Sequence, residues 1–228
     1  MRKLDLIILC GGLGKRIRSK SKKLPKILID IDKGKPFIKY LFKSLKIKYF
    51  NQIFLSIGYK KKRIIKFVKE NPKFNLAYCV ENKLLGTGGA VKNVIQKKKI
   101  SDPFLVVNGD TFLNFNVKKL IKKNTHNNKK QSLILLKRNE RGNRYNQFKI
   151  EDNKIIMLKK NYKDNNLINC GMYLFYKNDF KLKKKIFSIE KNILPTLIKK
   201  KKLNYFINNS KIFFDIGVPK DLDRFKKF

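Results

Sequence analysis

The chain has 228 residues, of which 42% are hydrophobic, so it is long enough to bury a substantial core. Its longest apolar runs fall far short of the roughly 18 residues that a membrane-spanning helix needs, and no signal-peptide pattern opens the chain. We therefore expect a cytoplasmic protein without membrane insertion. Its three cysteines are widely separated, which excludes a disulfide framework and a Cys-x-x-Cys metal site.

The net charge of +41 suggests a polyanionic partner such as nucleic acid. Only eight of the 57 basic residues are Arg, however, and the many Lys are spread over the whole length. Specific nucleic-acid readers rely on the fork geometry of Arg, so this distribution favours a solvated, Lys-rich surface and no specific nucleic-acid partner. A nucleic-acid-binding module is an alternative that the charge alone leaves open.

The first half of the chain alternates between predicted strands and predicted helices. Apolar runs that end at glycine or polar residues predict strands, and apolar residues at helical spacing predict helices. The predicted strands span residues 6–10, 52–59, 74–81 and 102–111, and the predicted helices span residues 36–49, 60–72 and 88–97. This order is typical of an α/β fold with a largely parallel sheet.

The second half has short apolar segments separated by polar turns. Predicted strands cover residues 131–138, 146–152, 154–160 and 169–176, followed by a helix over 189–201 and by a strand, a turn and a closing helix over 211–228. We expect these strands to form a mixed or antiparallel extension of the first sheet. No linker or internal repeat interrupts the sequence, which predicts a single domain over residues 1–228.

The first predicted strand ends at a glycine turn, CGGLGKRI, which is followed by a row of cations. The turn matches neither common phosphate loop, because Ile17 stands at the last position of a dinucleotide fingerprint and Arg16 follows the Gly-Lys pair of a P-loop. Glycine still lets backbone N–H groups approach an oxyanion closely, and Arg16 and Lys26 add positive charge nearby. The turn therefore predicts an anion site, with an ordinary strand-to-helix turn as the alternative.

Five segments resemble, in the same order, the motifs of the sugar-1-phosphate nucleotidyltransferases. They are LCGGLGKRI with LPKIL, VENKLLGTGGA, VVNGDT, INCGMYLF and FFDIGVPKD, and together they extend over nearly the whole chain. The LGTGGA form and the chain length look most like the branch of heptose-1-phosphate and mannose-1-phosphate guanylyltransferases. The resemblance implies a Rossmann-like three-layer α/β sandwich with a mixed, mainly parallel central sheet, without the carboxy-terminal left-handed β-helix of longer relatives.

The resemblance also implies a reaction in which a sugar 1-phosphate attacks the α-phosphorus of a nucleoside triphosphate and expels pyrophosphate. Both substrates are anions, so charge neutralisation and in-line positioning would dominate catalysis. By resemblance, Arg16, Lys26 and Asp110 are catalytic, and Asp110 and Asp215 hold Mg²⁺ through carboxylate oxygens. The residues implied to contact the nucleotide are Leu9, Gly11, Gly12, Gly14, Glu81, Gly86, Thr87 and Gly88. Those implied to contact the sugar phosphate are Lys160, Asn169, Gly171 and Glu190.

Several of these residues also have a simpler structural interpretation. Asp110 follows Asn-Gly and suits an Asx turn, although an acidic residue at the end of a central strand also lies where α/β proteins bind ligands. Asp215 precedes a Gly-Val-Pro turn. Thr87 suits a helix N-cap, and Glu81 suits either a base-contacting residue or a solvated carboxylate at a strand end.

The sequence departs from the family pattern at several places near the predicted site. Lys15 replaces Thr or Ser, Ile27 replaces a proline, and Lys159 stands where a glutamate that often contacts the sugar is usual. These changes leave UTP or dTTP with glucose 1-phosphate as an alternative to GTP with a manno-configured heptose or mannose 1-phosphate. A non-catalytic nucleotide-binding relative is a further alternative, and a homodimer is left open.

Overall fold

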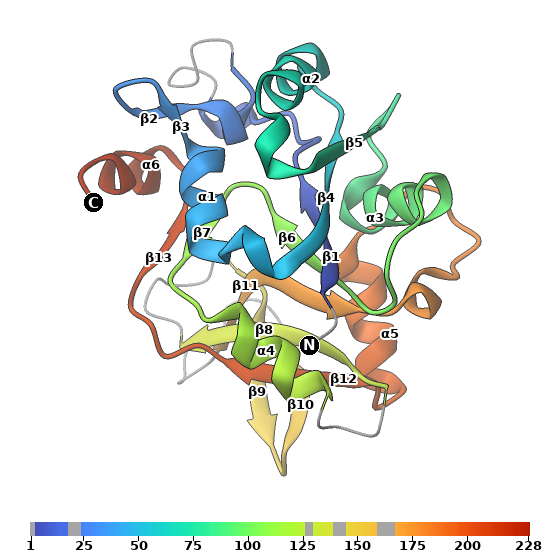
Figure 1. Cartoon of the computed structure of the whole chain (residues 1–228). Coiled ribbons are helices and arrows are strands. Elements are labelled where there is room, and N and C mark those ends of the chain that lie inside the picture. Colours follow the sequence, from blue (N-terminus) through green and yellow to red (C-terminus); the bar gives the residue numbers. More distant parts are fainter. Residues whose placement is uncertain (1–2, 18–23, 126–129, 139–144, 159–166) are drawn as a thin grey trace.

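A computed structural model of the protein describes residues 3–17, 24–125, 130–138, 145–158 and 167–228 (Figure 1). Within these residues, a nine-stranded mixed sheet forms the centre of the molecule and lies between two layers of helices. This arrangement confirms the expected three-layer α/β sandwich. No helix in the described part of the chain is long and apolar enough to cross a membrane.

The parallel half of the sheet comes from the first half of the chain. It contains β5 (Leu76–Val80), β4 (Phe50–Ile57), β1 (Leu4–Leu9) and β6 (Phe104–Asn108), in that order across the sheet. β1 pairs in parallel with both β4 and β6, and all of its residues except the last are buried. Strands that are covered on both faces have continuous apolar sequences, which explains why these segments were recognisable from the sequence.

The antiparallel half comes from the second half of the chain. β11 (Leu167–Phe175) pairs antiparallel with β6, and β8 (Ser132–Arg138) pairs antiparallel with β11. β9 (Gln147–Glu151) and β10 (Lys154–Met157) form a hairpin beside the first residues of β11. β12 (Leu203–Ile207), which the sequence pattern did not predict, runs parallel to β8. The expected mixed extension of the first sheet is therefore confirmed.

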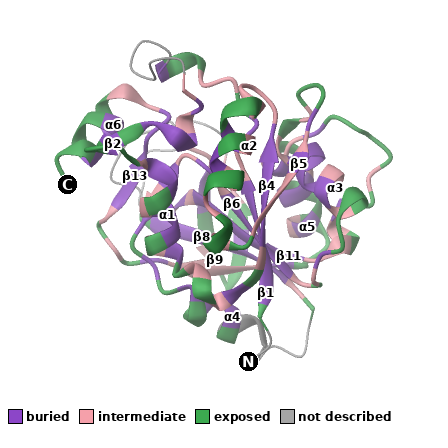
Figure 2. Cartoon of the chain, turned by 45° about the horizontal axis from the view of Figure 1, so that its top comes forward, coloured by how far each residue is buried: buried purple, intermediate pink, exposed green. Residues whose placement is uncertain are grey.

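Helices cover both faces of the sheet. One face is covered by α1 (Phe37–Leu45), α2 (Lys61–Glu70), α4 (Val117–Thr125) and α6 (Pro219–Lys226), and the other by α3 (Gly86–Lys97) and α5 (Leu194–Lys199). Alternate side chains of β1 divide between the two cores, with Leu6 and Ile8 on the first side and Ile7 on the second. Figure 2 shows this burial as purple strands enclosed by helices whose outer faces are green.

Shorter elements connect these layers. β2 (Asp30–Asp32) and β3 (Lys35–Pro36) form a small hairpin. The short 3-10 helices are η1 (Lys15–Ile17), η2 (Lys26–Leu28), η3 (Ile47–Tyr49), η4 (Pro72–Phe74) and η5 (Lys177–Phe180), and η6 (Ile189–Ile193) is a π-helix that leads into α5. The helix predicted over 189–201 is therefore two elements, because Pro195 cannot donate the backbone hydrogen bond of a continuous α-helix.

Two predicted boundaries are corrected by local backbone geometry. The helix predicted over 36–49 ends at Leu45, because Lys46 adopts a left-handed conformation with φ 49°. The strand predicted over 102–111 ends at Asn108, where the Gly109 N–H donates a 3.0 Å hydrogen bond to Leu9 O and the chain turns.

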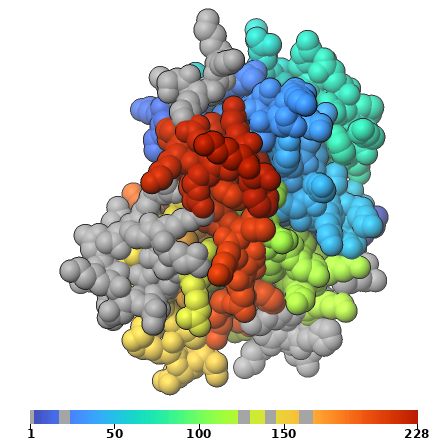
Figure 3. Space-filling model, turned by 90° about the vertical axis from the view of Figure 1, so that its left-hand side faces the viewer, coloured from blue at the N-terminus to red at the C-terminus, as the bar shows by residue number. Residues whose placement is uncertain are grey.

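A two-stranded ribbon brings the two predicted metal-binding carboxylates together. β7 (Thr111–Leu113) pairs antiparallel with β13 (Phe213–Asp215). Asp110 immediately precedes β7 and Asp215 ends β13, so the pairing places the two carboxylates next to each other. α6 packs behind the ribbon and against α1, and Figure 3 shows this C-terminal segment in red beside the first helices in blue.

Candidate active site

Two adjoining cavities lie at the carboxyl ends of the parallel strands, where α/β proteins bind ligands. The first, here called the glycine-turn cavity, has a volume of about 410 Å³. Six of the eight residues expected to contact a nucleotide line it: Leu9, Gly11, Gly12, Glu81, Gly86 and Thr87. Asn108 and Asp110 line this cavity and also the second one, so the two cavities meet at these residues.

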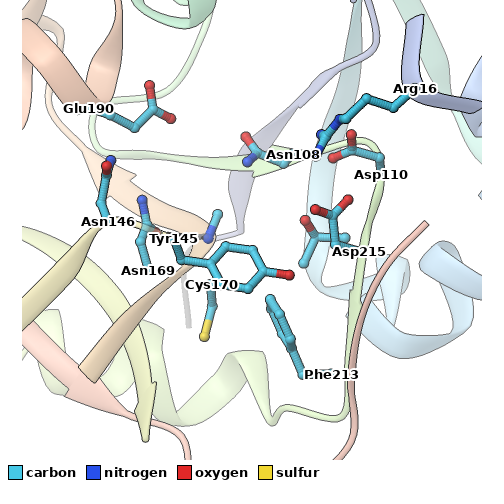
Figure 4. A pocket seen from close by; sticks show the side chains of 12 residues that line it. Arg16, Asn108, Asp110, Tyr145, Asn146, Asn169, Cys170, Glu190, Phe213 and Asp215 are labelled. Atoms are coloured by element: carbon cyan, nitrogen blue, oxygen red, sulfur yellow. Dashed lines mark hydrogen bonds between the residues drawn. The ribbon is translucent and has the colours of Figure 1, made fainter. Parts of the chain in front are cut away.

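The second cavity, here called the carboxylate cavity, has a volume of about 260 Å³ and is drawn in Figure 4. The predicted residues that line it come from distant parts of the chain: Arg16, Asp110, Asn169, Gly171, Glu190 and Asp215. In Figure 4, Arg16, Asp110 and Asp215 lie on one side of the cavity and Glu190 and Asn169 on the other. The fold therefore brings the separate sequence motifs to one place.

The glycine turn leaves part of its backbone open toward the first cavity. Gly12 is exposed, and a Cβ atom at this position would meet no atom within 4 Å. Gly11 is confined, because a Cβ atom there would lie 2.6 Å from Glu81 Oε1. Gly14 adopts φ +62° and packs against Lys26, with 3.3 Å between its Cβ position and Lys26 Cγ. Glycine is thus needed here both for backbone access and for close packing.

Glu81 lies beneath this turn as a buried carboxylate. Only 7% of its surface is exposed, and its Oε1 and Oε2 atoms accept hydrogen bonds from Ser56 Oγ (2.9 Å) and from the Leu85 N–H (3.3 Å). Burial raises the pKa of Glu81 above its usual value, although the two hydrogen bonds act in the opposite direction. The interpretation of Glu81 as a solvated carboxylate is therefore wrong. The residue lines the glycine-turn cavity, where a base-contacting residue is expected.

Lys26, Asp110 and Asp215 converge on Gly217. Lys26 Nζ lies 2.7 Å from Asp110 Oδ2. A Cβ atom at Gly217 would lie 2.9 Å from each of these two atoms and 2.8 Å from Asp215 Oδ1, so the three charged groups surround one point. Asp215 Oδ1 also accepts a 2.9 Å hydrogen bond from the Gly217 N–H. The predicted turn at Asp215 is therefore present, and it coexists with a carboxylate that lines the cavity.

β11 lines the carboxylate cavity where the strand is distorted. Its register with β8 shifts between Asn169 and Tyr173, and Gly171 adopts φ +68°. Asn169 Oδ1 accepts a hydrogen bond from the Gly171 N–H (2.8 Å), and Asn169 Nδ2 donates one to Tyr173 OH (2.6 Å). Burial raises the pKa of Tyr173 well above its ordinary value, so the phenol stays a donor and bonds Glu190 Oε1 at 3.3 Å.

Glu190 connects the two cavities. Its Oε2 atom accepts hydrogen bonds from Thr87 Oγ1 (2.8 Å) and Ser188 Oγ (2.6 Å). Thr87 Oγ1 itself accepts a hydrogen bond from the Ile189 N–H (2.8 Å). The N-cap position of α3 is occupied by Leu85, so the interpretation of Thr87 as the N-cap is wrong. The Thr87 hydroxyl instead ties the start of α3 to η6.

Some predicted site residues do not line either cavity. Gly88 is buried, and a Cβ atom there would lie 2.4 Å from ring atoms of Phe187, so this glycine seats the segment before η6 on α3. Gly14 and Lys26 line neither cavity, but Lys26 contacts Asp110, which lines both, and Gly14 packs against Lys26. Lys160, predicted to contact the sugar phosphate, lies outside the described residues.

The sequence matches one protein family along nearly its whole length. The profile described as "Nucleotidyl transferase" matches residues 6–228. The chain belongs to the nucleotidyl transferase family. It is 34% identical to the D-glycero-α-D-manno-heptose 1-phosphate guanylyltransferase of Campylobacter jejuni, over 97% of this chain and 98% of that protein. It is also 34% identical to the protein of the same name from Aneurinibacillus thermoaerophilus, over 98% of this chain and 97% of that protein.

A solved structure supports the same family and fold. The crystal structure of HddC from Yersinia pseudotuberculosis complexed with GMP-PN has a TM-score of 0.81 and 32% identity, and the match covers 98% of both chains. A nucleotidyl transferase must hold two anionic substrates side by side. Two cavities that share Asn108 and Asp110 provide such an arrangement.

Three residues of this nucleotidyl transferase site were not singled out from the sequence. Gly217 packs against both carboxylates, Tyr173 bonds residues of the second cavity, and Asn108 lines both cavities. Gly217 and Tyr173 stand inside motif segments, but their contacts involve groups from other strands and leave no sequence pattern. Asn108 carries a usable signal, because a polar amide ends an otherwise apolar central strand.

Proposed function

We propose that this nucleotidyl transferase transfers a guanylyl group from GTP to a sugar 1-phosphate of manno configuration, a heptose 1-phosphate in the first place and mannose 1-phosphate in the second. The observation that carries the proposal is the meeting of two cavities at Asp110, one lined by the glycine turn and the other by polar groups of β11 and η6. Similarity to two heptose 1-phosphate guanylyltransferases over nearly their full lengths supports the choice of substrates. The products would be a GDP-sugar and pyrophosphate.

The reaction forms one phosphorus–oxygen bond and breaks another. A phosphate oxygen of the sugar 1-phosphate attacks the α-phosphorus of GTP. The bond from that phosphorus to the bridging oxygen breaks, and pyrophosphate leaves with the electron pair. The attacking oxygen is already ionised, so the site needs positive charge and in-line positioning rather than a general base.

Arg16 and Lys26 supply positive charge beside Asp110, the residue at which the two cavities meet (Figure 4). Arg16 is exposed and lines the carboxylate cavity. Lys26 Nζ lies 2.7 Å from Asp110 Oδ2, where both cavities meet. In this proposal Arg16 neutralises the departing pyrophosphate, and Lys26 neutralises the phosphates at the reacting centre. The bare backbone of the glycine turn contacts the nucleotide phosphates beside them.

We further propose that Asp110 and Asp215 hold Mg²⁺. One oxygen of each lies within 2.9 Å of the Cβ position on Gly217, so the two carboxylates are neighbours on one side of the cavity (Figure 4). The described residues contain no cluster of three acidic, His or Cys side chains that could hold a metal by themselves. A pair is sufficient for Mg²⁺, which commonly takes one or two carboxylates together with water and substrate phosphates. When bound, the ion would neutralise phosphate charge next to Lys26.

Asn169, Gly171 and Glu190 contact the sugar phosphate in this proposal, together with Lys160, which lies outside the described residues. Hydrogen bonds within the protein hold Asn169 and Glu190 in fixed orientations through Tyr173. Polar groups that are already oriented lose little conformational entropy when a ligand binds, so they favour a specific substrate.

Pyrophosphate release by the purified protein tests this proposal. GTP, ATP, UTP and dTTP are each combined with the 1-phosphates of D-glycero-α-D-manno-heptose, mannose and glucose in the presence of Mg²⁺. We expect release with GTP and a manno-configured acceptor, and its loss when a chelator removes the metal. Asp110→Asn should lower turnover by about 10³-fold. The matched change Asp152→Asn, in the exposed turn between β9 and β10, should leave turnover unchanged.

Each other result of this experiment identifies a different function. Release with UTP or dTTP and glucose 1-phosphate would keep the reaction and replace its substrates. Binding of GTP without release by any pair would indicate a nucleotide-binding relative without catalysis. Neither binding nor release, by a folded protein, would overturn the enzymatic proposal and return attention to nucleic acid as a partner for the basic surface.

A further inference from the structure

Asn108 occupies the point where the two cavities meet. It is the last residue of β6, stands opposite Leu9 of β1, and lines both cavities. In Figure 4 it lies between Glu190 and Asp110. Two substrates held in the two cavities would therefore approach each other beside its side chain.

The amide of Asn108 has hydrogen-bonding capacity that the protein does not use. Its Oδ1 atom is buried and has no hydrogen-bond partner, and it is the only buried side-chain nitrogen or oxygen in this condition among the described residues. The neighbouring polar groups of Asn169, Glu190 and Asp110 all have partners within the protein. Buried polar groups are normally paired, so an unpaired one beside a ligand cavity indicates a partner that the substrate supplies.

The side chain of Asn108 packs against Gly171 with its Nδ2 atom nearest. A Cβ atom at Gly171 would lie 2.5 Å from Asn108 Nδ2 and 2.9 Å from Asn108 Cγ. Gly171 belongs to β11 and lines the carboxylate cavity but not the glycine-turn cavity. The missing side chain at position 171 therefore gives the amide room next to the place that the sugar phosphate would occupy.

The chemistry of the amide restricts what it can bind. Oδ1 needs a hydrogen-bond donor, and ionised phosphate oxygens only accept, so a phosphate group could pair with Nδ2 but would leave Oδ1 unpaired. A hydroxyl group both donates and accepts, and it therefore pairs with the amide in either orientation of the oxygen and the nitrogen. We propose that Asn108 is a specificity-determining residue that hydrogen-bonds a hydroxyl group of the sugar 1-phosphate. This inference rests on the proposed function, which takes a sugar 1-phosphate as the occupant of the carboxylate cavity.

A cycle that combines a protein variant with substrate analogues tests the inference. The values of kcat/KM are measured by pyrophosphate release for the wild-type protein and for Asn108→Leu, with GTP and either mannose 1-phosphate or each of its 2-, 3-, 4- and 6-deoxy analogues. Leu is close to Asn in shape and makes no hydrogen bond. Removal of one particular hydroxyl should lower kcat/KM of the wild-type protein about tenfold, and should have no further effect in Asn108→Leu.

Affinity for GTP separates a local effect from a general one. GTP affinity measured by calorimetry should be the same for both proteins, because the inference places the contact on the sugar. Asn108→Ala, which needs no new space, carries the same expectations and replaces Asn108→Leu if that variant does not bind GTP. A purely structural role of Asn108 would lower activity with every analogue alike and would leave the cost of each missing hydroxyl unchanged.

Three results would overturn the inference in distinguishable ways. Equal losses in both proteins for every deoxy sugar would show that Asn108 contacts none of these hydroxyl groups. The same comparison is made with 2′-deoxy-GTP and 3′-deoxy-GTP. If removal of a ribose hydroxyl lowers kcat/KM of the wild-type protein but not of Asn108→Leu, Asn108 contacts the nucleotide instead of the sugar 1-phosphate. Absence of turnover by the wild-type protein with any pair would overturn the proposed function itself, and the inference with it.

Discussion

Two glycine-rich segments lie beside the same cavity and use glycine for different purposes. In the first, residues 11–14, Gly12 is exposed and a Cβ atom there would meet nothing within 4 Å. In the second, residues 86–89, Gly88 is buried and a Cβ atom there would lie 2.4 Å from the Phe187 ring. Gly12 in the first segment leaves backbone bare for a ligand, whereas Gly88 in the second leaves room for another part of the protein.

The backbone of the second segment is also occupied. The N–H groups of Gly88 and Gly89 donate hydrogen bonds to Phe187 O at 3.0 and 3.1 Å. These donors cannot bind a phosphate as well, although the two segments look alike as strings of glycine. The role of each glycine therefore depends on which atoms of the folded chain surround it, and variants of the two segments should differ accordingly.

The largest expected effect concerns Lys26, whose side chain packs against Gly14 of the first segment. Lys26→Met keeps the aliphatic stem beside Gly14 and removes the charge, so turnover should fall by about 10³-fold. The same variant should bind Mn²⁺ more tightly in the absence of nucleotide, because Asp110 loses an ammonium group that lies 2.7 Å away and competes with a metal. Mn²⁺ binding is measured by electron paramagnetic resonance, which does not depend on activity.

A matched Lys→Met change provides the control for this variant. Lys39 is exposed on α1, and Lys39→Met should alter neither turnover nor Mn²⁺ affinity. Unchanged turnover in Lys26→Met would show that the first segment does not bring a catalytic cation to the site. Unchanged Mn²⁺ affinity would show that the Lys26 ammonium group does not compete with a metal ion for Asp110.

The next effect is on stability and belongs to the second segment. Gly88→Ala forces a methyl group against Phe187 and should lower the free energy of unfolding by about 1–3 kcal/mol. Phe187→Leu makes space, so the double variant should be more stable than the sum of the single effects predicts. Urea denaturation measures all three. Wild-type stability in Gly88→Ala would mean that Phe187 yields freely, and the contrast between the two segments would disappear.

A smaller effect is expected for the exposed glycine of the first segment. Gly12→Ala adds a methyl group in open space, so the free energy of unfolding should stay at the wild-type value. GTP affinity should fall by about tenfold, because the methyl group stands where the nucleotide approaches the backbone. Calorimetry and urea denaturation of the same preparation measure both quantities. Normal GTP affinity would show that the bare backbone at Gly12 is not used.

Most of the fold was predictable because the segments that form it carry their own patterns. β1 and β6 are apolar runs that are covered on both faces, and α1 and α2 have apolar residues at helical spacing. β12 was missed because its residues follow a run of lysines and become a strand through parallel pairing with β8, which is distant in the sequence.

The candidate site was predictable as motifs but not as contacts. The motifs located Asp110 and Asp215 separately, and their meeting at Gly217 depends on the pairing of two strands of only three residues each. The hydrogen bond between Thr87 and Glu190 likewise joins elements from different halves of the chain. Such contacts depend on how the elements are arranged in space, and the periodicity of hydrophobic residues in the sequence does not predict that arrangement.

The smallest effect concerns Glu81, whose carboxylate lies 2.6 Å from the Cβ position of Gly11 in the first segment. Burial raises the pKa of Glu81 in the folded protein above its ordinary value of 4.5, so the ionised form is disfavoured by folding. Ionised Glu81 therefore destabilises the folded protein at pH values above the folded-state pKa. This destabilisation disappears as the pH falls through that pKa toward 4.5. Glu81→Gln removes the titration. Its amide oxygen still accepts a hydrogen bond from Ser56 Oγ, but its amide nitrogen cannot accept the one from the Leu85 N–H.

The Tm of Glu81→Gln minus the Tm of the wild-type protein should therefore be most positive in mildly alkaline buffer and should decrease as the pH falls toward 4.5. Thermal melts across this pH range measure it. A difference that is independent of pH would contradict the raised pKa. If the variant is more stable but binds GTP less tightly, the buried carboxylate lowers stability and contributes to nucleotide binding. The first segment would then pack against Glu81, which contributes to ligand binding, whereas the second packs against Phe187, which contributes to stability.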